Sequence, residues 1–236
     1  AQRIVCMSSS YIAMLDAVGQ GDRIVAVSGI NYIANPYILA HKDSIKDMGP
    51  EMNYELLLGL KPDVVLLYGI GDAQTAVTDK LKELAIPYMY VGEYLEESPL
   101  GKAEWLVALS ELTDRRDQGI DVFREIPKRY QALKDLTASV EQRPTVMFNT
   151  PWNDSWVMPS TQSYMVQLVT DAGADYIYKE NTSNSSAPIG LETAYGLIQK
   201  ADYWINVGTA STLDELKNMN PKFADAKSVR DKTVYN

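Results

Sequence analysis

Aromatic and uncharged polar side chains follow several predicted strands of this 236-residue chain, and they are the residues best suited to ligand chemistry. Loops at the carboxyl ends of parallel strands are held on a rigid frame, and ligands usually bind there. Flat aromatic faces beside neutral hydrogen-bonding groups suit a large, partly apolar ligand that must be oriented. The candidate ligand-binding residues are Tyr11, Asn31, Tyr32, Tyr94, Trp152, Asn153, Trp156 and Tyr164.

The segment Pro151–Trp156 (PWNDSW) is the strongest of these candidates. A single tyrosine is more often a half-buried packing residue than a ligand contact. Two tryptophans in a polar loop rarely serve a core, so we expect Trp152 and Trp156 to contact the ligand. Replacing either by alanine is then expected to weaken binding by more than about 1 kcal/mol and to leave the fold intact.

The distribution of arginine narrows the class of ligand. Arginine is the preferred partner of carboxylates and of catecholate-type anions, and none lies in the predicted strand-end loops. A strongly anionic ferric siderophore is therefore less favoured than a hydroxamate chelate, a corrinoid or haem. Haem needs an axial ligand, which a tyrosine or His41 can supply, but nothing in the sequence singles one out.

Enzymatic and bare-metal alternatives rest on weaker patterns. Gly69-Ile70-Gly71 follows a strand, but Gln74 replaces the third glycine of a dinucleotide loop and no P-loop lysine follows. The serines at 8–10 with His41 resemble part of a hydrolase triad, yet no G-x-S-x-G motif is present and serines at a helix start usually act as caps. A zinc or manganese carrier needs several His or Cys ligands, whereas this chain has one of each. We expect a binding protein without a resident cofactor, and keep a hydrolase-like enzyme and a bare-metal carrier as alternatives.

Composition argues against a nucleic-acid-binding protein and against a membrane-spanning one. A net charge of −9 repels nucleic acid. No apolar run approaches the roughly 20 residues that span a bilayer, and the first residues already have the pattern of a strand. With 46% hydrophobic residues, the chain can bury a sizeable core.

Strands and helices alternate along the first half of the chain. Near-continuous apolar runs predict strands at 3–7, 23–27, 64–68 and 88–91, separated by helices at 11–18, 54–60 and 73–84. Asn53 is placed to cap the second of these helices. Ser98-Pro99 starts a further helix, with Leu106, Leu109 and Leu112 facing inward. This alternation is typical of a parallel sheet covered on both faces.

The same order of elements returns after residue 140. Strands are predicted at 145–148, 176–178, 203–207 and 233–235, with helices from about 160 to 172 and from Glu192 onward. The two halves are joined by an amphipathic helix over 114–140, capped by Asp114 or Thr113, in which Pro127 predicts a kink or a junction of two helices. We therefore predict an N-terminal α/β lobe at 1–113, the interlobe helix at 114–140, and a C-terminal α/β lobe at 141–236. The last strand ends on Asn236 with no helix behind it, so we expect this lobe to be truncated.

Several segments, in their order and spacing, give the chain a resemblance to a known family. They are residues 3–29, 53–69 (NYELLLGLKPDVVLLYG) and 80–87 in the first half, and 144–149, 168–178, 191–197 and 201–208 (ADYWINVG) in the second. Together they resemble the iron-chelate and cobalamin class of periplasmic substrate-binding proteins over nearly the whole chain. The resemblance implies two Rossmann-like lobes with parallel sheets joined by one long helix, and a ligand cleft between the lobes.

The resemblance also implies a function. Members capture a metal chelate (an iron siderophore, haem or cobalamin) and deliver it to the membrane permease of an ABC importer. The protein is then expected in the periplasm or on the outer face of the cytoplasmic membrane, as a monomer. Its export signal or lipid anchor is expected to lie outside the given sequence, together with at least one more C-terminal helix.

Two glutamates are the expected contacts with the permease. Glu55 and Glu192 each open the helix that leads into an Asp-to-Gly strand segment, 63–69 in the first half and 202–208 in the second. In the family that the chain resembles, acidic residues at these places pair with arginines of the membrane subunits. A carboxylate in the first turn of a helix is also favoured by the helix dipole alone, which is the structural alternative.

Overall fold

A computed structural model describes residues 1–49, 51–69 and 73–236. Residues 70 and 71 of the Gly69-Ile70-Gly71 segment lie outside these ranges. The chain divides into two compact units, which we describe separately. Unit 1 comprises residues 1–94 and 100–127, and unit 2 comprises residues 95–99 and 128–236. Within the described ranges, no helix combines the length and hydrophobicity needed to cross a membrane.

The sheet of unit 1 is parallel, as predicted, with the strand order β3-β2-β1-β4-β5. Its strands are β1 (Ile4–Cys6), β2 (Ile24–Val27), β3 (Lys46–Asp47), β4 (Val64–Leu67) and β5 (Tyr88–Tyr90). Alternate side chains of β1 and β4 enter two different cores, with Ile4 and Leu66 in one and Val5 and Leu67 in the other. Burial on both faces explains why these strands are continuous apolar runs.

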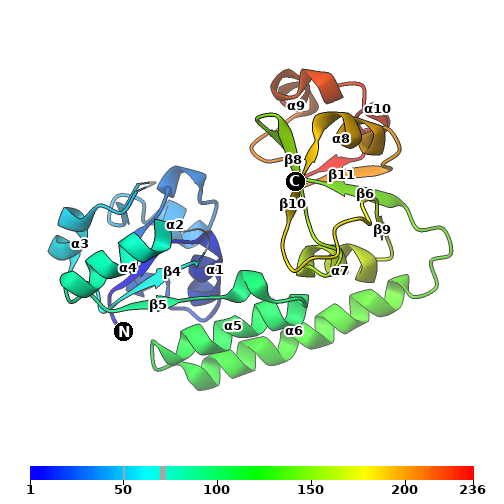
Figure 1. Ribbon diagram of the computed structural model, residues 1–236. Coiled ribbons are helices and arrows are strands. Elements are labelled where there is room, and N and C mark those ends of the chain that lie inside the picture. The colour runs from blue at the N-terminus through cyan, green and yellow to red at the C-terminus, as the bar shows by residue number, and fades with distance from the viewer. Residues whose placement is uncertain (50, 70–72) are drawn as a thin grey trace. The chain divides into compact units, whose positions relative to one another are not determined.

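Six helices accompany this sheet: α1 (Ser9–Ala17), α2 (Pro36–Ala40), α3 (Tyr54–Leu60), α4 (Ala73–Glu83), α5 (Pro99–Glu111) and the first part of α6 (Arg116–Thr137). Leu109 of α5 packs in one core and Leu81 of α4 in the other. Accordingly, α5 and α4 lie on opposite sides of β4 and β5 (Figure 1). The predicted cap of α3 is confirmed, because the Asn53 side chain accepts a hydrogen bond from Leu56 N at 3.0 Å.

The prediction that Asp114 or Thr113 caps the long helix is wrong. Asp114 has a φ of 60°, and its N–H donates to Glu111 O at 3.1 Å while Arg115 N–H donates to Ser110 O at 2.9 Å. This is the Schellman arrangement that closes the end of α5. The Thr113 hydroxyl also turns back, donating to Ser110 O at 3.0 Å. The long helix therefore begins later, at Arg116.

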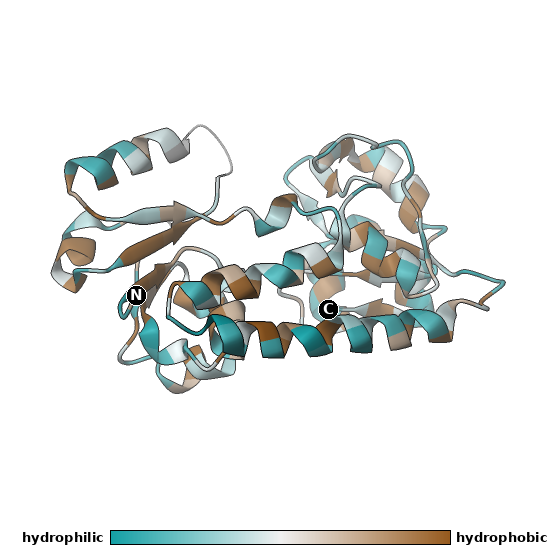
Figure 2. Ribbon diagram, turned by 90° about the horizontal axis from the view of Figure 1, so that it is seen from below, coloured by the Kyte–Doolittle hydropathy of each residue, from teal (hydrophilic) through white to brown (hydrophobic). Residues whose placement is uncertain are grey.

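Helix α6 is a single helix of 22 residues that contains Pro127 in its interior, so two helices do not meet there. Polar and apolar residues alternate along it (Figure 2), as expected for an amphipathic helix. The division between the units falls within this helix, at Pro127.

Unit 2 repeats the parallel sheet, with the order β12-β11-β6-β9. The strands are β6 (Thr145–Phe148), β9 (Asp175–Tyr176), β11 (Tyr203–Ile205) and β12 (Val234–Tyr235), and the helices are α7 (Tyr164–Asp171), α8 (Leu191–Ile198), α9 (Leu213–Met219) and α10 (Lys227–Asp231). Sequence patterns did not predict the three-stranded antiparallel sheet of β10 (Ala187–Gly190), β8 (Ser155–Met158) and β7 (Pro151–Trp152). They also did not predict α9 and α10.

Within unit 2, Asp171 holds the last turns of α6 against α7. Its carboxylate accepts from the Tyr130 hydroxyl at 2.7 Å and pairs with Lys134 Nζ at 2.9 Å, and its backbone oxygen accepts from the Thr137 hydroxyl at 2.7 Å. Burial by itself raises the pKa of Asp171, but the hydrogen bonds from Lys134 and Tyr130 outweigh it and lower the pKa. The charged form is therefore the stabilising one.

Acidification should consequently loosen unit 2 through this residue. Because the folded-state pKa of Asp171 is lowered, its contribution to stability is complete above the unfolded carboxyl pKa of about 3.9 and is lost as pH falls through the folded value. Asp171→Asn should cost about 2 kcal/mol at pH 7 and flatten the fall of the melting temperature between about pH 5 and 3. Asp121→Asn, which removes an exposed ion pair with Arg124, is the control. If Asp171→Asn had the melting temperature of the parent both at pH 7 and at about pH 3, this account of Asp171 would be wrong.

Candidate functional site

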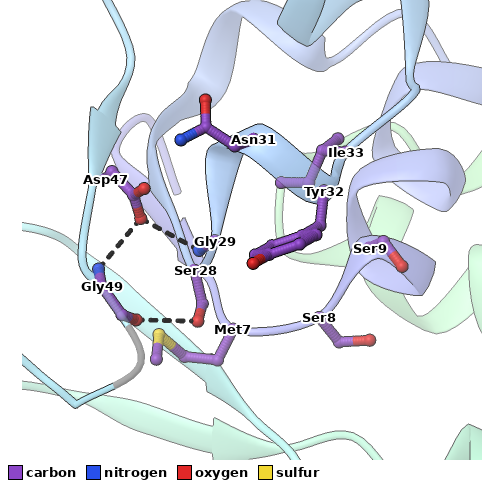
Figure 3. A pocket seen from close by; sticks show the side chains of 10 residues that line it. All are labelled: Met7, Ser8, Ser9, Ser28, Gly29, Asn31, Tyr32, Ile33, Asp47 and Gly49. Atoms are coloured by element: carbon purple, nitrogen blue, oxygen red, sulfur yellow. Dashed lines mark hydrogen bonds between the residues drawn. The ribbon is translucent and has the colours of Figure 1, made fainter. Parts of the chain in front are cut away.

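A hollow of about 500 Å³ lies at the carboxyl ends of β1, β2 and β3 in unit 1, and we call it the strand-end hollow (Figure 3). Its position agrees with the rule that parallel sheets bind ligands outside the carboxyl ends of their strands. The residues that line it are Met7, Ser8, Ser9, Ser28, Gly29, Asn31, Tyr32, Ile33, Asp47 and Gly49. The predicted contacts Asn31 and Tyr32 are therefore brought together here.

Gly29 directs the chain from β2 into the hollow. It has a φ of 68°, which side-chain-bearing residues rarely adopt, and it precedes a short 3-10 helix over Ile30–Tyr32. A Cβ at Gly29 would lie 3.4 Å from the ring of Tyr32, so the ring lies directly over this glycine (Figure 3). Tyr32 nevertheless remains 86% exposed. An aromatic ring that is positioned by the backbone but left uncovered is suited to stacking on a ligand.

Asp47 connects the segments on two sides of the hollow through hydrogen bonds. One carboxylate oxygen accepts from Gly29 N and Gly49 N, both at 2.9 Å, and the other accepts from Ile30 N at 3.2 Å. The Ser28 hydroxyl donates to Gly49 O at 3.0 Å on the same side (Figure 3). These bonds join the ends of β2 and β3 into one frame. Sequence reasoning missed Asp47, because β3 is two exposed residues long and has no apolar pattern.

The lining of the hollow is neutral apart from this aspartate. None of its described residues is a lysine or an arginine. Lys42, which is exposed, donates to Asn31 Oδ1 at 3.0 Å and thereby orients that amide. The hollow therefore offers hydroxyl, amide and aromatic groups together with the Asp47 carboxylate, and the Lys42 ammonium lies beside it as the partner of Asn31.

Two of the predicted ligand contacts, Tyr11 and Trp156, are core residues in the structure. Tyr11 is fully buried, and its hydroxyl lies 3.2 Å from both Leu67 O and Val91 O. Burial and the carboxylate of Glu93 raise its pKa, so it remains a neutral donor inside unit 1. Trp156 is also fully buried in unit 2. A side chain without exposed surface offers no contact to a ligand, so the expectation for both residues is corrected.

Trp152 and Asn153 lie instead at an exposed turn of unit 2. Trp152 ends β7, pairs with Ser155 of β8 and is 74% exposed. Asn153 occupies the turn itself with a φ of 53°, a conformation that asparagine tolerates better than most residues. Tyr94 and Tyr164 are both half-buried. A Cβ at Gly69 would lie 3.3 Å from the Tyr94 hydroxyl, and Tyr164 is the first residue of α7.

The residues of the hydrolase alternative have structural partners. Ser8 is the cap of α1, with its hydroxyl accepting from Ser10 N at 3.3 Å. The ring of His41 stacks on Tyr37 at 4.1 Å, and its Nδ1 lies 2.8 Å from Tyr37 O. Across the described part of the chain, no group of three or more His, Cys, Asp and Glu side chains is arranged to hold a metal ion.

Glu55 and Glu192 both lie in the first turns of exposed helices, α3 and α8 respectively. Both side chains are exposed. Neither forms an ion pair with another residue of the described ranges. Each carboxylate is therefore available to a partner outside the chain.

Comparison with known proteins identifies the family. The sequence profile of the periplasmic binding proteins matches residues 4–236. The chain belongs to this family. Its members are binding proteins by class, and the two units with parallel sheets are the fold of the solved structures that resemble it.

Individual relatives extend this finding. An uncharacterized lipoprotein of Methanocaldococcus jannaschii is 27% identical over 99% of this chain and 58% of its own length. A vitamin B12-binding protein of Yersinia pestis is 28% identical over 62% of this chain and 50% of its own length. The chain thus spans only about half to three fifths of these relatives. A periplasmic heme binding protein from Pseudomonas aeruginosa has the same fold, with a TM-score of 0.79 at 16% identity over 99% of this chain and 82% of that one.

Proposed function

We propose that this chain is the substrate-binding component of an ABC importer, acting outside the cytoplasmic membrane, and that it captures a metal chelate for delivery to the permease. The observation that carries the proposal is the family match across residues 4–236. The names of the relatives, which include a vitamin B12-binding protein and a lipoprotein, support the class of ligand and the location. We further propose that the protein binds its ligand without chemical turnover.

The strand-end hollow supports a chelate of low negative charge. Its groups are hydroxyls, an amide, a tyrosine ring and one aspartate, which favours a corrinoid, haem or a ferric hydroxamate over a ferric catecholate. Each unit is proposed to offer its own contacts. In unit 1 these are Asn31 and Tyr32 at the hollow together with Tyr94, and in unit 2 they are Trp152 and Asn153 at the exposed turn together with Tyr164. We propose Glu55 and Glu192 as the contacts with the permease.

A panel of thermal shifts tests the function. Cyanocobalamin, haem, ferrichrome and ferric enterobactin should each be added to the purified chain, because a ligand that binds only the folded state raises its melting temperature. We expect a rise of several degrees with one of the first three and none with the catecholate. Tyr32→Ala should weaken the binding of the ligand that raises the melting temperature by about fivefold or more, as expected for an aromatic anchor.

Tyr195→Ala is the matched control, since Tyr195 is another exposed tyrosine and does not line the hollow. This variant should bind the ligand found in the thermal panel as tightly as the parent does. A rise with the catecholate alone would contradict the proposed charge preference. Steady hydrolysis of a model ester by the parent would contradict the proposal of binding without turnover.

A further inference from the structure

The triplet Asn-x-Ser/Thr, which can accept an oligosaccharide on its asparagine, occurs three times in the chain, each time in unit 2. The three asparagines are Asn153, Asn181 and Asn184, and none of them is followed by proline. This modification is found on surface loops of exported proteins. Because so short a motif is common, the surroundings of each asparagine decide whether it can be an acceptor.

The side chain of Asn181 is used by the fold. The residue is only 7% exposed. Its Nδ2 donates to Ser185 O at 2.9 Å and to Met158 O at 3.4 Å, and its Oδ1 accepts from the Ser183 hydroxyl at 2.7 Å. A buried amide nitrogen that makes two hydrogen bonds cannot enter the catalytic site of a transferase unless the loop unfolds. Asn181 is therefore the anchor of its loop and not an acceptor.

Asn153 is exposed but occupies the tight turn between β7 and β8, with a φ of 53°. The hydroxyl of this triplet belongs to Ser155, which pairs with Trp152 in the ladder and donates to Trp152 O at 3.3 Å. A transferase recognises the hydroxyl together with the amide, so it would have to open this turn to bind both groups. Asn153 is therefore a poor acceptor in the folded protein.

Asn184 lies in the middle of the exposed segment 182–186, between β9 and β10. The backbone beside it is held from below, because Ser185 O accepts from the anchor Asn181 at 2.9 Å. Both Asn184 and Ser186, which supplies the hydroxyl of this triplet, are exposed, and neither side chain has a hydrogen-bond partner in the described ranges. The fold thus presents both groups that a transferase must contact.

We propose that Asn184 is an N-glycosylation site and the acceptor among the three asparagines. This inference rests on the proposed location of the chain outside the cytoplasmic membrane. In the transfer, Asn184 Nδ2 attacks the anomeric carbon of an oligosaccharide carried on a membrane lipid phosphate. A C–N bond forms, the C–O bond to the phosphate breaks, the lipid phosphate leaves, and one amide proton passes to the solvent. The glycan covers an exposed loop of the kind at which proteases cut.

A glycan on Asn184 is compatible with the ligand contacts proposed at the exposed turn of unit 2. In the antiparallel ladder, Ala187 begins β10 next to the loop, and Gly190 ends it opposite Ser155 at the turn. At about 3.4 Å per residue, roughly 10 Å of strand separates these two ends. Asn184 and Trp152 therefore lie beyond opposite ends of the same sheet.

Transfer of a glycan to the folded protein tests the inference. The purified chain is incubated with an archaeal oligosaccharyltransferase and its lipid-linked oligosaccharide, and the products are mapped by peptide mass spectrometry. We expect one glycan per chain, on Asn184. Asn184→Gln removes the nucleophile and Ser186→Ala removes the required hydroxyl, so each should reduce transfer at least tenfold. Ser185→Ala is the matched control: it changes the neighbouring exposed serine at the middle position of the triplet, where any residue except proline is accepted, and should leave transfer unchanged.

A peptide of residues 179–189 that carries Asn181→Gln separates the motif from the fold. If the peptide is glycosylated and the folded chain is not, the loop does not present Asn184 and the inference is wrong. It is equally wrong if neither is glycosylated while a standard acceptor peptide is, or if the folded chain carries its glycan on Asn153 or Asn181. The assay needs neither the ligand nor the permease. Its failure therefore leaves the proposed function standing, and a negative thermal panel leaves this inference standing.

Discussion

Reversal of both exposed glutamates, as Glu55→Arg with Glu192→Arg, should abolish uptake of the ligand through the cognate importer and leave ligand affinity unchanged. The two carboxylates are exposed, lie in the first turns of matched helices and have no ion-pair partner among the described residues. Arginines at these positions would meet the cations of the partner, and like charges placed together cost several kcal/mol. Uptake into proteoliposomes that contain the importer measures the effect, and isothermal titration measures ligand affinity.

The control for this experiment is a second pair of charge reversals, Glu104→Arg with Glu141→Arg. Both glutamates are exposed and lie outside α3 and α8. The two double variants change the net charge of −9 by the same amount, so a general effect of charge on diffusion to the membrane would appear in both. Normal uptake by the Glu55 and Glu192 variant would show that the permease binds elsewhere.

Two elements have the bounds predicted from the sequence, the strand at 145–148 and the helix at 54–60 that Asn53 caps. The strand at 145–148 has the predicted bounds, because a strand buried on both faces must be a continuous apolar run. The antiparallel strand β7 lies in the segment PWNDSW, whose polar residues favour a loop, and β8 begins at the end of that segment. Their pairing depends on a tight turn at Asn153 and on β10, which lies about thirty residues further along the chain. Pairing over such a separation leaves no local pattern in the sequence.

Single residues of the candidate site also differ in how far the local sequence predicts their place. Tyr11 and Tyr32 both follow strands of the first sheet, yet one is fully buried and the other is 86% exposed. A local signal separates them: Tyr11, Leu15 and Val18 are spaced by four and three residues and are all fully buried, which is the pattern of an inward helix face. Tyr32 has no such neighbours. No local signal marks Asp47, whose role depends on three backbone N–H groups that the fold brings to it.

The two tryptophans of the PWNDSW segment should respond in opposite ways to substitution by alanine. Trp156→Ala should destabilise unit 2 by about 3–5 kcal/mol, the range for deletion of a buried aromatic side chain. Trp156 packs 5.0 Å from Phe223 and 5.6 Å from Trp204, and its Nε1 donates to Phe148 O at 2.7 Å. Trp152→Ala should change stability by no more than about 0.5 kcal/mol, because Trp152 is 74% exposed, and should weaken ligand binding about fivefold or more.

Denaturant unfolding followed by circular dichroism measures the first effect, and titration with the ligand found in the thermal panel measures the second. The two residues have the same type and lie four positions apart, so each variant is the control for the other. If Trp156→Ala unfolds at the parental denaturant concentration, the described core of unit 2 is incorrect. If Trp152→Ala binds the ligand as tightly as the parent, the exposed turn does not contact the ligand. Loss of binding by Trp156→Ala with its stability intact would restore the original expectation that Trp156 is itself a contact.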